Sequence, residues 1–120
     1  MSAMSDRADC LFCRIVKHEI PASIVYEDDR VCAFNDINPQ GPTHVLVVPK
    51  RHIASLNDLS EDDDRIVGEL VRRAAAIAKD RGVSAGGFRT VFNTNRDAGQ
   101  TVFHVHLHLI GGRILHWPPG

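Results

Sequence analysis

Histidine alternates with apolar residues along TVFHVHLHLI, residues 101–110, and this alternation constrains the fold more than any other feature of the chain. Successive side chains of a β-strand point to opposite faces of a sheet, so a period of two predicts a strand over residues 101–110. We expect His104, His106 and His108 to form a row on one face of this strand. The opposite face should pack against a helix through Phe103, Val105, Leu107 and Leu109.

A short helix and four further strands are predicted from local patterns. The amphipathic stretch over residues 10–19, which ends before Pro21, predicts the short helix. Short apolar runs bounded by turn-forming residues predict strands over residues 24–27, 31–36, 44–49 and 88–93.

A long helix is predicted to begin at Ser60 and to end near Gly82. Ser60 can cap its N-terminus together with Asp63, three residues later. Apolar residues then recur at helical spacing, at Ile66, Val67, Leu70, Val71, Ala74, Ile77 and Ala78. The predicted fold class is therefore α+β, an antiparallel sheet of about five strands with one long and one short helix.

The composition argues against nucleic acid and membranes as binding partners. The 120 residues suit one domain, and a net charge of −1 without a basic stripe argues against binding to a nucleic-acid backbone. No apolar run approaches the roughly 20 residues that span a bilayer, and the polar start lacks the apolar segment of a signal peptide. Three cysteines, an odd number, argue against a disulfide framework, so we expect a cytoplasmic protein with no membrane partner.

The histidine row suggests catalysis at phosphorus. His104 and His108 would lie roughly 13 Å apart along a strand, too far for one metal ion to bind all three rings. Neutral imidazole is a competent nucleophile, and a neighbouring imidazole can hold phosphate oxygens. Gly99, in the preceding loop, permits close approach of backbone amides to an anion. The alternative is a strand whose polar histidines simply face solvent.

Cys10 and Cys13 have the spacing of one half of a tetrahedral zinc site. Two free thiols are the alternative. Cys32 lies in an apolar strand and is interpreted as a small core residue.

The chain resembles the histidine-triad (HIT) superfamily, and within it the Hint branch. The resemblance is carried by residues 100–110, and also by KHEIPA at 17–22, Pro42-Thr-His44, Val48-Pro49-Lys50, Gly111-Gly112-Arg113 and the ending His116-Trp-Pro-Pro-Gly120. It covers nearly all of the chain after the first nine residues. We accordingly expect a disordered tail over residues 1–9, one HIT domain over 10–120 with a C-terminal tail over 111–120, and a homodimer that continues the sheet.

The resemblance implies a role for each polar residue of the site. His106 would be the nucleophile, oriented by the backbone carbonyl of His104, with His44 supporting the row from a neighbouring strand. His108 and Asn93 would contact phosphate oxygens, together with the loop residues Gly99 and Gln100. Thr101 would lie near the leaving group, and Asp36 would bind the ribose hydroxyls.

The resemblance also implies an apolar slot for the base, formed by Phe12, Ile20, Phe34, Ile37 and Leu46, although core packing would explain each of these equally well. A structural zinc ion would be bound by Cys10, Cys13, His52 and His104, and catalysis would need no cofactor.

The activity implied is hydrolysis of the P–N bond of a purine nucleoside phosphoramidate, with adenosine 5′-phosphoramidate as the leading substrate and AMP as product. Hydrolysis of dinucleoside polyphosphates is the second enzymatic reading. A nucleotide-binding module with little turnover and a purely structural zinc module are the non-enzymatic alternatives. The Trp117-Pro-Pro-Gly ending favours the phosphoramidase.

Overall fold

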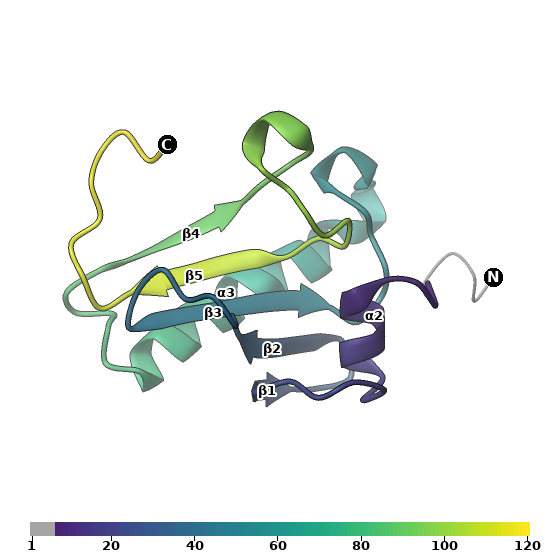
Figure 1. Ribbon diagram of the computed structural model, residues 1–120, viewed down its shortest axis with the longest axis horizontal. Coiled ribbons are helices and arrows are strands. Elements are labelled where there is room, and N and C mark those ends of the chain that lie inside the picture. The colour runs from purple at the N-terminus through teal and green to yellow at the C-terminus, as the bar shows by residue number, and fades with distance from the viewer. Residues whose placement is uncertain (1–6) are drawn as a thin grey trace.

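The computed structural model describes residues 7–120, and five of its segments form one antiparallel sheet in the order β1-β2-β3-β5-β4 (Figure 1). The strands are β1 (Ile24–Glu27), β2 (Val31–Asn35), β3 (Thr43–Pro49), β4 (Phe88–Phe92) and β5 (Leu107–Gly111). The α-helices are α2 (Leu11–Val16) and α3 (Asp64–Asp80), with 3₁₀ turns at Leu56–Asp58, Glu61–Asp63 and Arg96–Ala98. The predicted α+β fold with one long and one short helix is confirmed.

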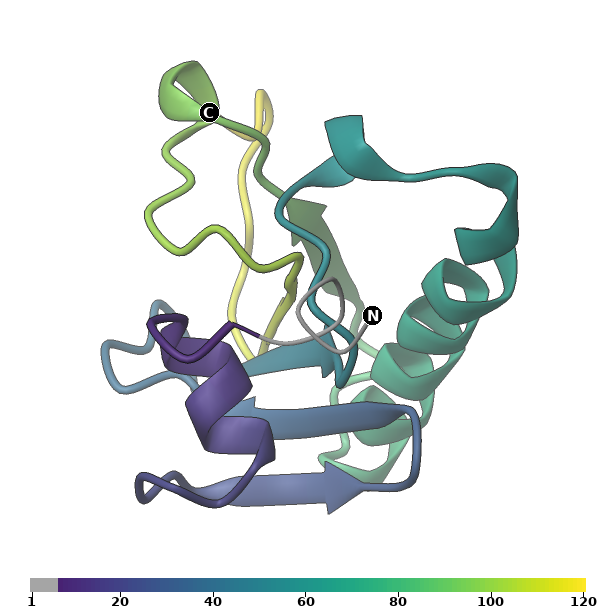
Figure 2. The same ribbon diagram turned by 90° about the vertical axis from the view of Figure 1, so that its right-hand side faces the viewer.

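The two helices cover opposite faces of the sheet, as the view along its edge shows (Figure 2). Apolar residues of α3, with Leu70 at their centre, pack on Val45, Val47, Leu107 and Leu109. On the other face, Phe12 and Ile15 of α2 pack on Cys32, Phe34, Leu46 and Val48. The central strand β3 is buried throughout, so its alternate residues supply both cores.

The long helix ends near Gly82 as predicted, whereas at its start a 3₁₀ turn over Glu61–Asp63 separates Ser60 from the first α-helical residue, Asp64. The backbone N–H of Ser60 donates to the Asp63 carboxylate over 2.9 Å, and a 3₁₀ turn leads into α3. Gly82 adopts a φ of +74°, a left-handed conformation that suits glycine and ends the helix. Val71, one of the apolar residues at helical spacing, does not lie on the buried face. It lies about 100° around the helix from Leu70 and is 47% exposed.

The prediction of a strand over residues 101–110 is wrong for its first half, because β5 begins only at Leu107. Leu107 pairs with Val47 of β3 and with Phe92, the last residue of β4. β4 ends here, and although β3 continues to Pro49, the residues before Leu107 do not pair with it. The Val105 N–H donates to the Ile53 carbonyl, and the Pro49 carbonyl accepts from the His104 ring. Val105, Leu107 and Leu109 are buried as predicted, whereas Phe103 is 50% exposed and does not join the apolar face.

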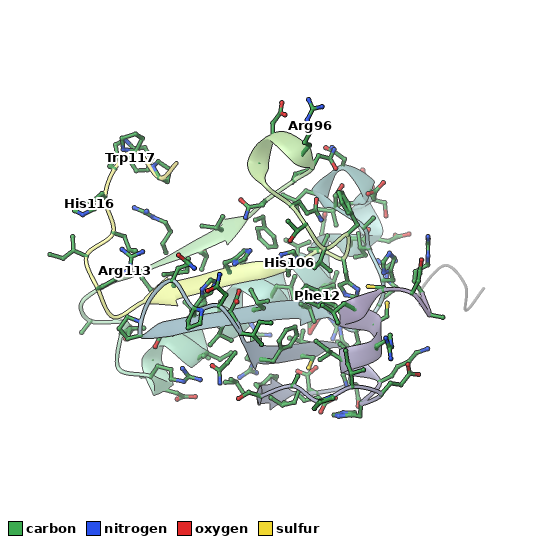
Figure 3. All side chains as sticks on the ribbon, in the orientation of Figure 1. Phe12, Arg96, His106, Arg113, His116 and Trp117 are labelled. Carbon is green, nitrogen blue, oxygen red and sulfur yellow. The ribbon has the colours of Figure 1, made fainter. Side chains whose placement is uncertain are left out.

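The described residues at the two ends of the chain differ in local structure. The predicted disordered tail spans residues 1–9, of which 1–6 lie outside the described residues, while Arg7 and the residues after it form a turn into α2. The C-terminal tail after Gly111 has no regular structure and leaves Ile114 and Trp117 largely exposed (Figure 3). Within residues 7–120, no helix is both long enough and apolar enough to cross a bilayer.

Candidate functional site

His106 is held in one orientation by the backbone of His104. The Nδ1 atom of His106 lies 2.8 Å from the His104 carbonyl oxygen. A carbonyl oxygen only accepts hydrogen bonds, so Nδ1 carries the proton. The Nε2 atom of the neutral ring therefore keeps its lone pair, which is the form a nucleophile requires.

His44 and His108 form a second pair, on the adjacent strands β3 and β5. The backbone N–H of Gln40 donates to His44 Nδ1 over 3.0 Å, which leaves the proton of the neutral ring on Nε2. His44 Nε2 lies 2.9 Å from His108 Nδ1 and donates to it. His108 must then carry its own proton on Nε2, so it is a hydrogen-bond donor at its far end.

The rings of this site are closely packed. The ring centroids of His106 and His108 are 4.9 Å apart, and those of His44 and His108 are 5.2 Å apart. Phe12 of α2 meets His106 edge to face at 5.1 Å, and Figure 3 shows the two side chains next to each other near the centre of the molecule. The predicted row of imidazoles is thus present, although only His108 belongs to β5.

Burial keeps these imidazoles neutral at pH 7. It lowers the pKa of His106 and of His44 from the ordinary value of 6.5. Burial, together with the neighbouring rings of His106 and His44, lowers the pKa of His108 to about 4. A cation is costly in such surroundings, whereas a neutral donor or nucleophile is not.

A pocket of about 370 Å³ opens in front of His106 and His108, a volume within the range of small-molecule sites. Nine predicted residues line it, namely Phe12, Ile20, Phe34, Asp36, Ile37, Leu46, Thr101, His106 and His108. Seven further residues line the pocket that were not predicted from the sequence, namely Leu11, Ile15, Pro21, Ala22, Ser23, Asn35 and Val102. Four of the seven directly adjoin a predicted residue, and Pro21 and Ala22 also lie within the KHEIPA segment, so those neighbours were the available signal.

Asp36 and Ile37 stand at the mouth of this pocket, directly after β2. One carboxylate oxygen of Asp36 accepts from the N–H of Asn38 over 2.8 Å, and the other lies 3.4 Å from His44 Nε2. Ile37 is fully exposed. The mouth therefore offers a carboxylate for hydroxyl groups and an apolar surface beside it.

Five of the residues predicted for catalysis or nucleotide binding, namely His44, Asn93, Gly99, Gln100 and His104, do not line the pocket. Gln100 has its side chain fully engaged, since Nε2 donates to the carbonyls of Ala54 and Val102 and Oε1 accepts from the N–H of Asn95. The N–H groups of Gly99 and Gln100 donate within their own loop, to Arg96 and Asn95. In this conformation neither amide is a free phosphate donor.

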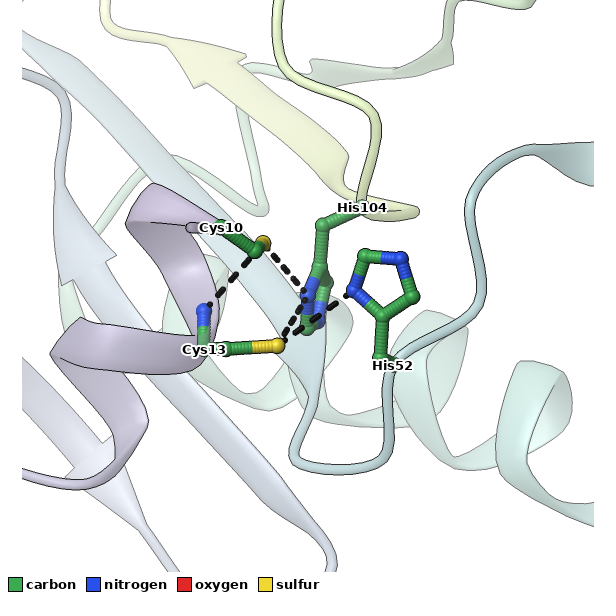
Figure 4. Close-up of side chains that lie close together, drawn as sticks. All are labelled: Cys10, Cys13, His52 and His104. Atoms are coloured by element: carbon green, nitrogen blue, oxygen red, sulfur yellow. Dashed lines mark hydrogen bonds between the residues drawn. The ribbon is translucent and has the colours of Figure 1, made fainter. Parts of the chain in front are cut away.

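Cys10, Cys13, His52 and His104 form a compact cluster beside the pocket (Figure 4). His104 Nδ1 lies 3.4 Å from Cys10 Sγ and 3.5 Å from Cys13 Sγ, and His52 Nδ1 lies 3.3 Å from Cys13 Sγ. A tetrahedral zinc ion with ordinary bond lengths places sulfur and nitrogen ligands about 3.5 Å apart. The donor set and its spacing therefore fit zinc.

The surroundings of this cluster also suit a metal. His104 donates from Nε2 to the Pro49 carbonyl over 2.8 Å, which turns the lone pair of Nδ1 toward the sulfurs, as in ligating histidines. Burial lowers the pKa of His104 to about 4, which keeps the ring in the neutral form that ligates.

Comparisons with known proteins give a consistent result. Residues 9–115 match the family model described as scavenger mRNA decapping enzyme, C-terminal binding. The chain is 46% identical over 107 residues to the purine nucleoside phosphoramidase of Escherichia coli K12, covering 89% of this chain and 90% of that protein. It is 47% identical over 112 residues to an uncharacterized HIT-like protein of Synechocystis, covering 93% and 97%. The crystal structure of a HIT family hydrolase from Legionella pneumophila superposes with a TM-score of 0.92 at 51% identity, covering 93% and 100%.

Proposed function

Because the chain belongs to the histidine-triad (HIT) family, we propose that it hydrolyses the P–N bond of purine nucleoside 5′-phosphoramidates, with adenosine 5′-phosphoramidate as substrate. The observation that carries this proposal is the orientation of His106. Its Nδ1–H is bound to the His104 carbonyl over 2.8 Å, and its ring lines the pocket. Nε2 is thereby left as the one nucleophilic atom of that ring.

In the first step, His106 Nε2 attacks the α-phosphorus and the P–N bond of the substrate breaks. The departing nitrogen keeps the electron pair of the broken bond and takes up a proton from the solvent, which the attacking water returns in the second step. The nucleotide becomes covalently attached to His106 Nε2. His108 donates from Nε2 to a non-bridging phosphate oxygen, on which charge is concentrated in the transition state. Thr101 lies at the pocket and has a hydroxyl to offer the leaving group.

In the second step, water attacks the same phosphorus and the bond to His106 breaks. AMP leaves, and the ring returns to its starting tautomer. The sum of the two steps consumes one water and releases one amine and one AMP, and it needs no cofactor.

The remainder of the nucleotide has a place in the same pocket. Asp36 accepts hydrogen bonds from the ribose hydroxyls, while the base lies among the apolar side chains of Phe12, Ile20, Phe34, Ile37 and Leu46. The name of the Escherichia coli relative, purine nucleoside phosphoramidase, supports a P–N substrate over a dinucleoside polyphosphate.

A direct comparison of substrates tests this proposal. The protein should release AMP from adenosine 5′-phosphoramidate at a kcat/KM at least about a hundredfold above that for diadenosine tetraphosphate. His18→Ala serves as the control, because His18 is an exposed histidine outside the pocket. AMP release from diadenosine tetraphosphate alone would contradict the proposal.

We also propose that Cys10, Cys13, His52 and His104 bind one zinc ion. The sulfur–nitrogen distances of 3.3–3.5 Å support it, and the metal would tie α2 to the segments that carry His52 and His104. Zinc here is structural, since His106 does not contribute to the cluster. A cytoplasmic location, where thiols stay reduced, belongs to the same proposal.

Finally, we propose a homodimer that continues the sheet through β4. This strand lies at one end of the sheet order, and an unpaired edge is open to pairing with a second copy. The exposed Ile114 and Trp117 of the C-terminal tail would be buried in such an assembly. A single-subunit mass by light scattering at micromolar concentration would contradict it.

A further inference from the structure

The Gly111-Gly112-Arg113 segment, at the end of β5, packs against the loop over residues 36–42, of which Asp36 and Ile37 line the pocket. A Cβ atom on Gly112 would lie 2.9 Å from the Pro42 Cβ, and one on Gly41 would lie 3.2 Å from the Gly111 carbonyl oxygen. Gly112 also has a φ of +90°, which favours glycine. The two backbones are therefore in close contact, with no room for a larger residue at Gly112.

Arg113 adds a polar contact to this packing. Its Nε donates to the Gln40 carbonyl over 2.7 Å, and its Nη1 donates to the Ile114 carbonyl over 3.0 Å. The same residue, Gln40, donates from its backbone N–H to His44 Nδ1 over 3.0 Å. Gln40 thus accepts a hydrogen bond from Arg113 through its carbonyl and donates one to His44 through its N–H.

We propose that Arg113 is a positioning residue for the histidine row, which fixes Gln40 so that its N–H keeps the proton of His44 on Nε2. His44 then donates to His108, and His108 remains a donor toward phosphate. The inference rests on the proposed function for its catalytic consequence, but not for its effect on the tautomer of His44.

The tautomer of His108 depends on that of His44, and through it on the backbone N–H of Gln40. If Gln40 moves away, the His44 proton is free to occupy Nδ1, and its Nε2 becomes an acceptor. His108 would then have to donate from Nδ1, and its other nitrogen would present a lone pair to the phosphate. A donor would be replaced by a repulsive contact, at a position where one hydrogen bond is typically worth about 10²–10³ in kcat.

Arg89 offers a matched control. It also binds the C-terminal tail, with Nη2 donating to the His116 carbonyl over 3.0 Å. Unlike Arg113, it has no described contact with the loop over residues 36–42. A general effect of loosening the tail would therefore be seen equally in Arg89→Met and Arg113→Met.

The experiment combines long-range ¹H–¹⁵N NMR of the histidine rings at pH 7 with kinetics on adenosine 5′-phosphoramidate. In the wild type and in Arg89→Met, His44 should be a single Nε2-protonated tautomer. In Arg113→Met and in Gly112→Ala, which displaces the loop by a different route, His44 should show mixed tautomers. Arg113→Lys, which keeps a cationic donor, should lie closer to the wild type.

Kinetics provide the second readout. We expect kcat to fall at least about tenfold in Arg113→Met and to change less than about twofold in Arg89→Met. A pure Nε2 tautomer of His44 in folded Arg113→Met would overturn the inference, as would equal losses in both arginine variants. If the wild type fails to release AMP, the proposed function fails, and the NMR comparison still decides the role of Arg113.

Discussion

The Nδ1 atom of His106 lies 2.8 Å from the backbone carbonyl oxygen of His104, while the ring of His104 belongs to the cluster of Cys10, Cys13 and His52. One residue thus takes part in two sites, with its backbone orienting the proposed nucleophile and its side chain completing the proposed zinc site. The carbonyl of His104 is available to the His106 ring because residues 101–106 lie outside the β5 ladder.

The pH dependence of kcat/KM should reflect the lowered pKa of the buried His106 ring. Attack requires the neutral ring, and burial lowers the pKa of His106 below 6.5. We expect kcat/KM, which reports the free enzyme, to be constant from about pH 8 to about pH 6.5 and to fall only below that. The Asp36 carboxylate raises this pKa, so Asp36→Asn should move the acid limb to lower pH. A limb centred above 6.5, or an upward shift in Asp36→Asn, would contradict this assignment.

Asp36 should discriminate ligands by their ribose hydroxyls. A hydrogen bond to a charged group is worth about 1.5–3 kcal/mol, which corresponds to roughly 10–150-fold in affinity. Calorimetry should show that the wild type binds AMP more tightly than 2′,3′-dideoxy-AMP by about this factor, and that Asp36→Asn largely loses the difference. Asp29→Asn, in the exposed turn between β1 and β2, is the control and should keep the difference. Unchanged discrimination in Asp36→Asn would remove Asp36 from the site.

Zinc content should depend on two of the three cysteines. Elemental analysis of protein expressed with zinc should give about one ion per chain for the wild type, and none for Cys10→Ser combined with Cys13→Ser. Cys32→Ala should retain the ion, because Cys32 lies outside the cluster and burial raises the pKa of its thiol to about 11. Chelation should lower the unfolding temperature of the wild type but not that of the double variant. Zinc retained by the double variant would contradict the site.

Replacing Gln100 should lower the free energy of unfolding. Its buried side chain makes three hydrogen bonds, to Ala54, Asn95 and Val102. Gln100→Ala leaves those backbone groups without a partner and should lower the free energy of unfolding by about 1–3 kcal/mol, measured by urea denaturation. Arg96→Ala, at an exposed position of the same loop, should change it by less than about 0.5 kcal/mol. Equal stability of the two variants would show that the Gln100 contacts contribute little.

Much of the fold was predictable because it depends on local periodicity. The alternation in residues 101–110 correctly indicated that Val105, Leu107 and Leu109 are buried, although not that Phe103 is exposed. It did not indicate where the ladder begins, at Leu107, since that depends on where the neighbouring strand β4 ends, at Phe92. The contact of Arg113 with Gln40 joins positions 73 residues apart and leaves no periodic signal.

The residue types of the candidate site could be predicted from the sequence, but the contacts that hold these residues in place could not. Alternating histidines and a closely spaced cysteine pair seldom serve packing alone. Their residue types therefore indicated the histidine row and the cysteine–histidine cluster. Gln100 lies in the same motif as the histidines and was therefore predicted to bind the nucleotide. The contacts of its side chain with Ala54 and Val102 could be found only in three dimensions.

The central claim is that His106 becomes covalently attached to the nucleotide. The most direct test is mass spectrometry of protein quenched in denaturing base during turnover of adenosine 5′-phosphoramidate, with His106→Ala alongside. We expect an added adenylyl group that maps to His106 and is absent from His106→Ala, together with a loss of kcat of at least about a thousandfold in that variant. An adduct on another residue, or AMP release by His106→Ala at the wild-type rate, would contradict it.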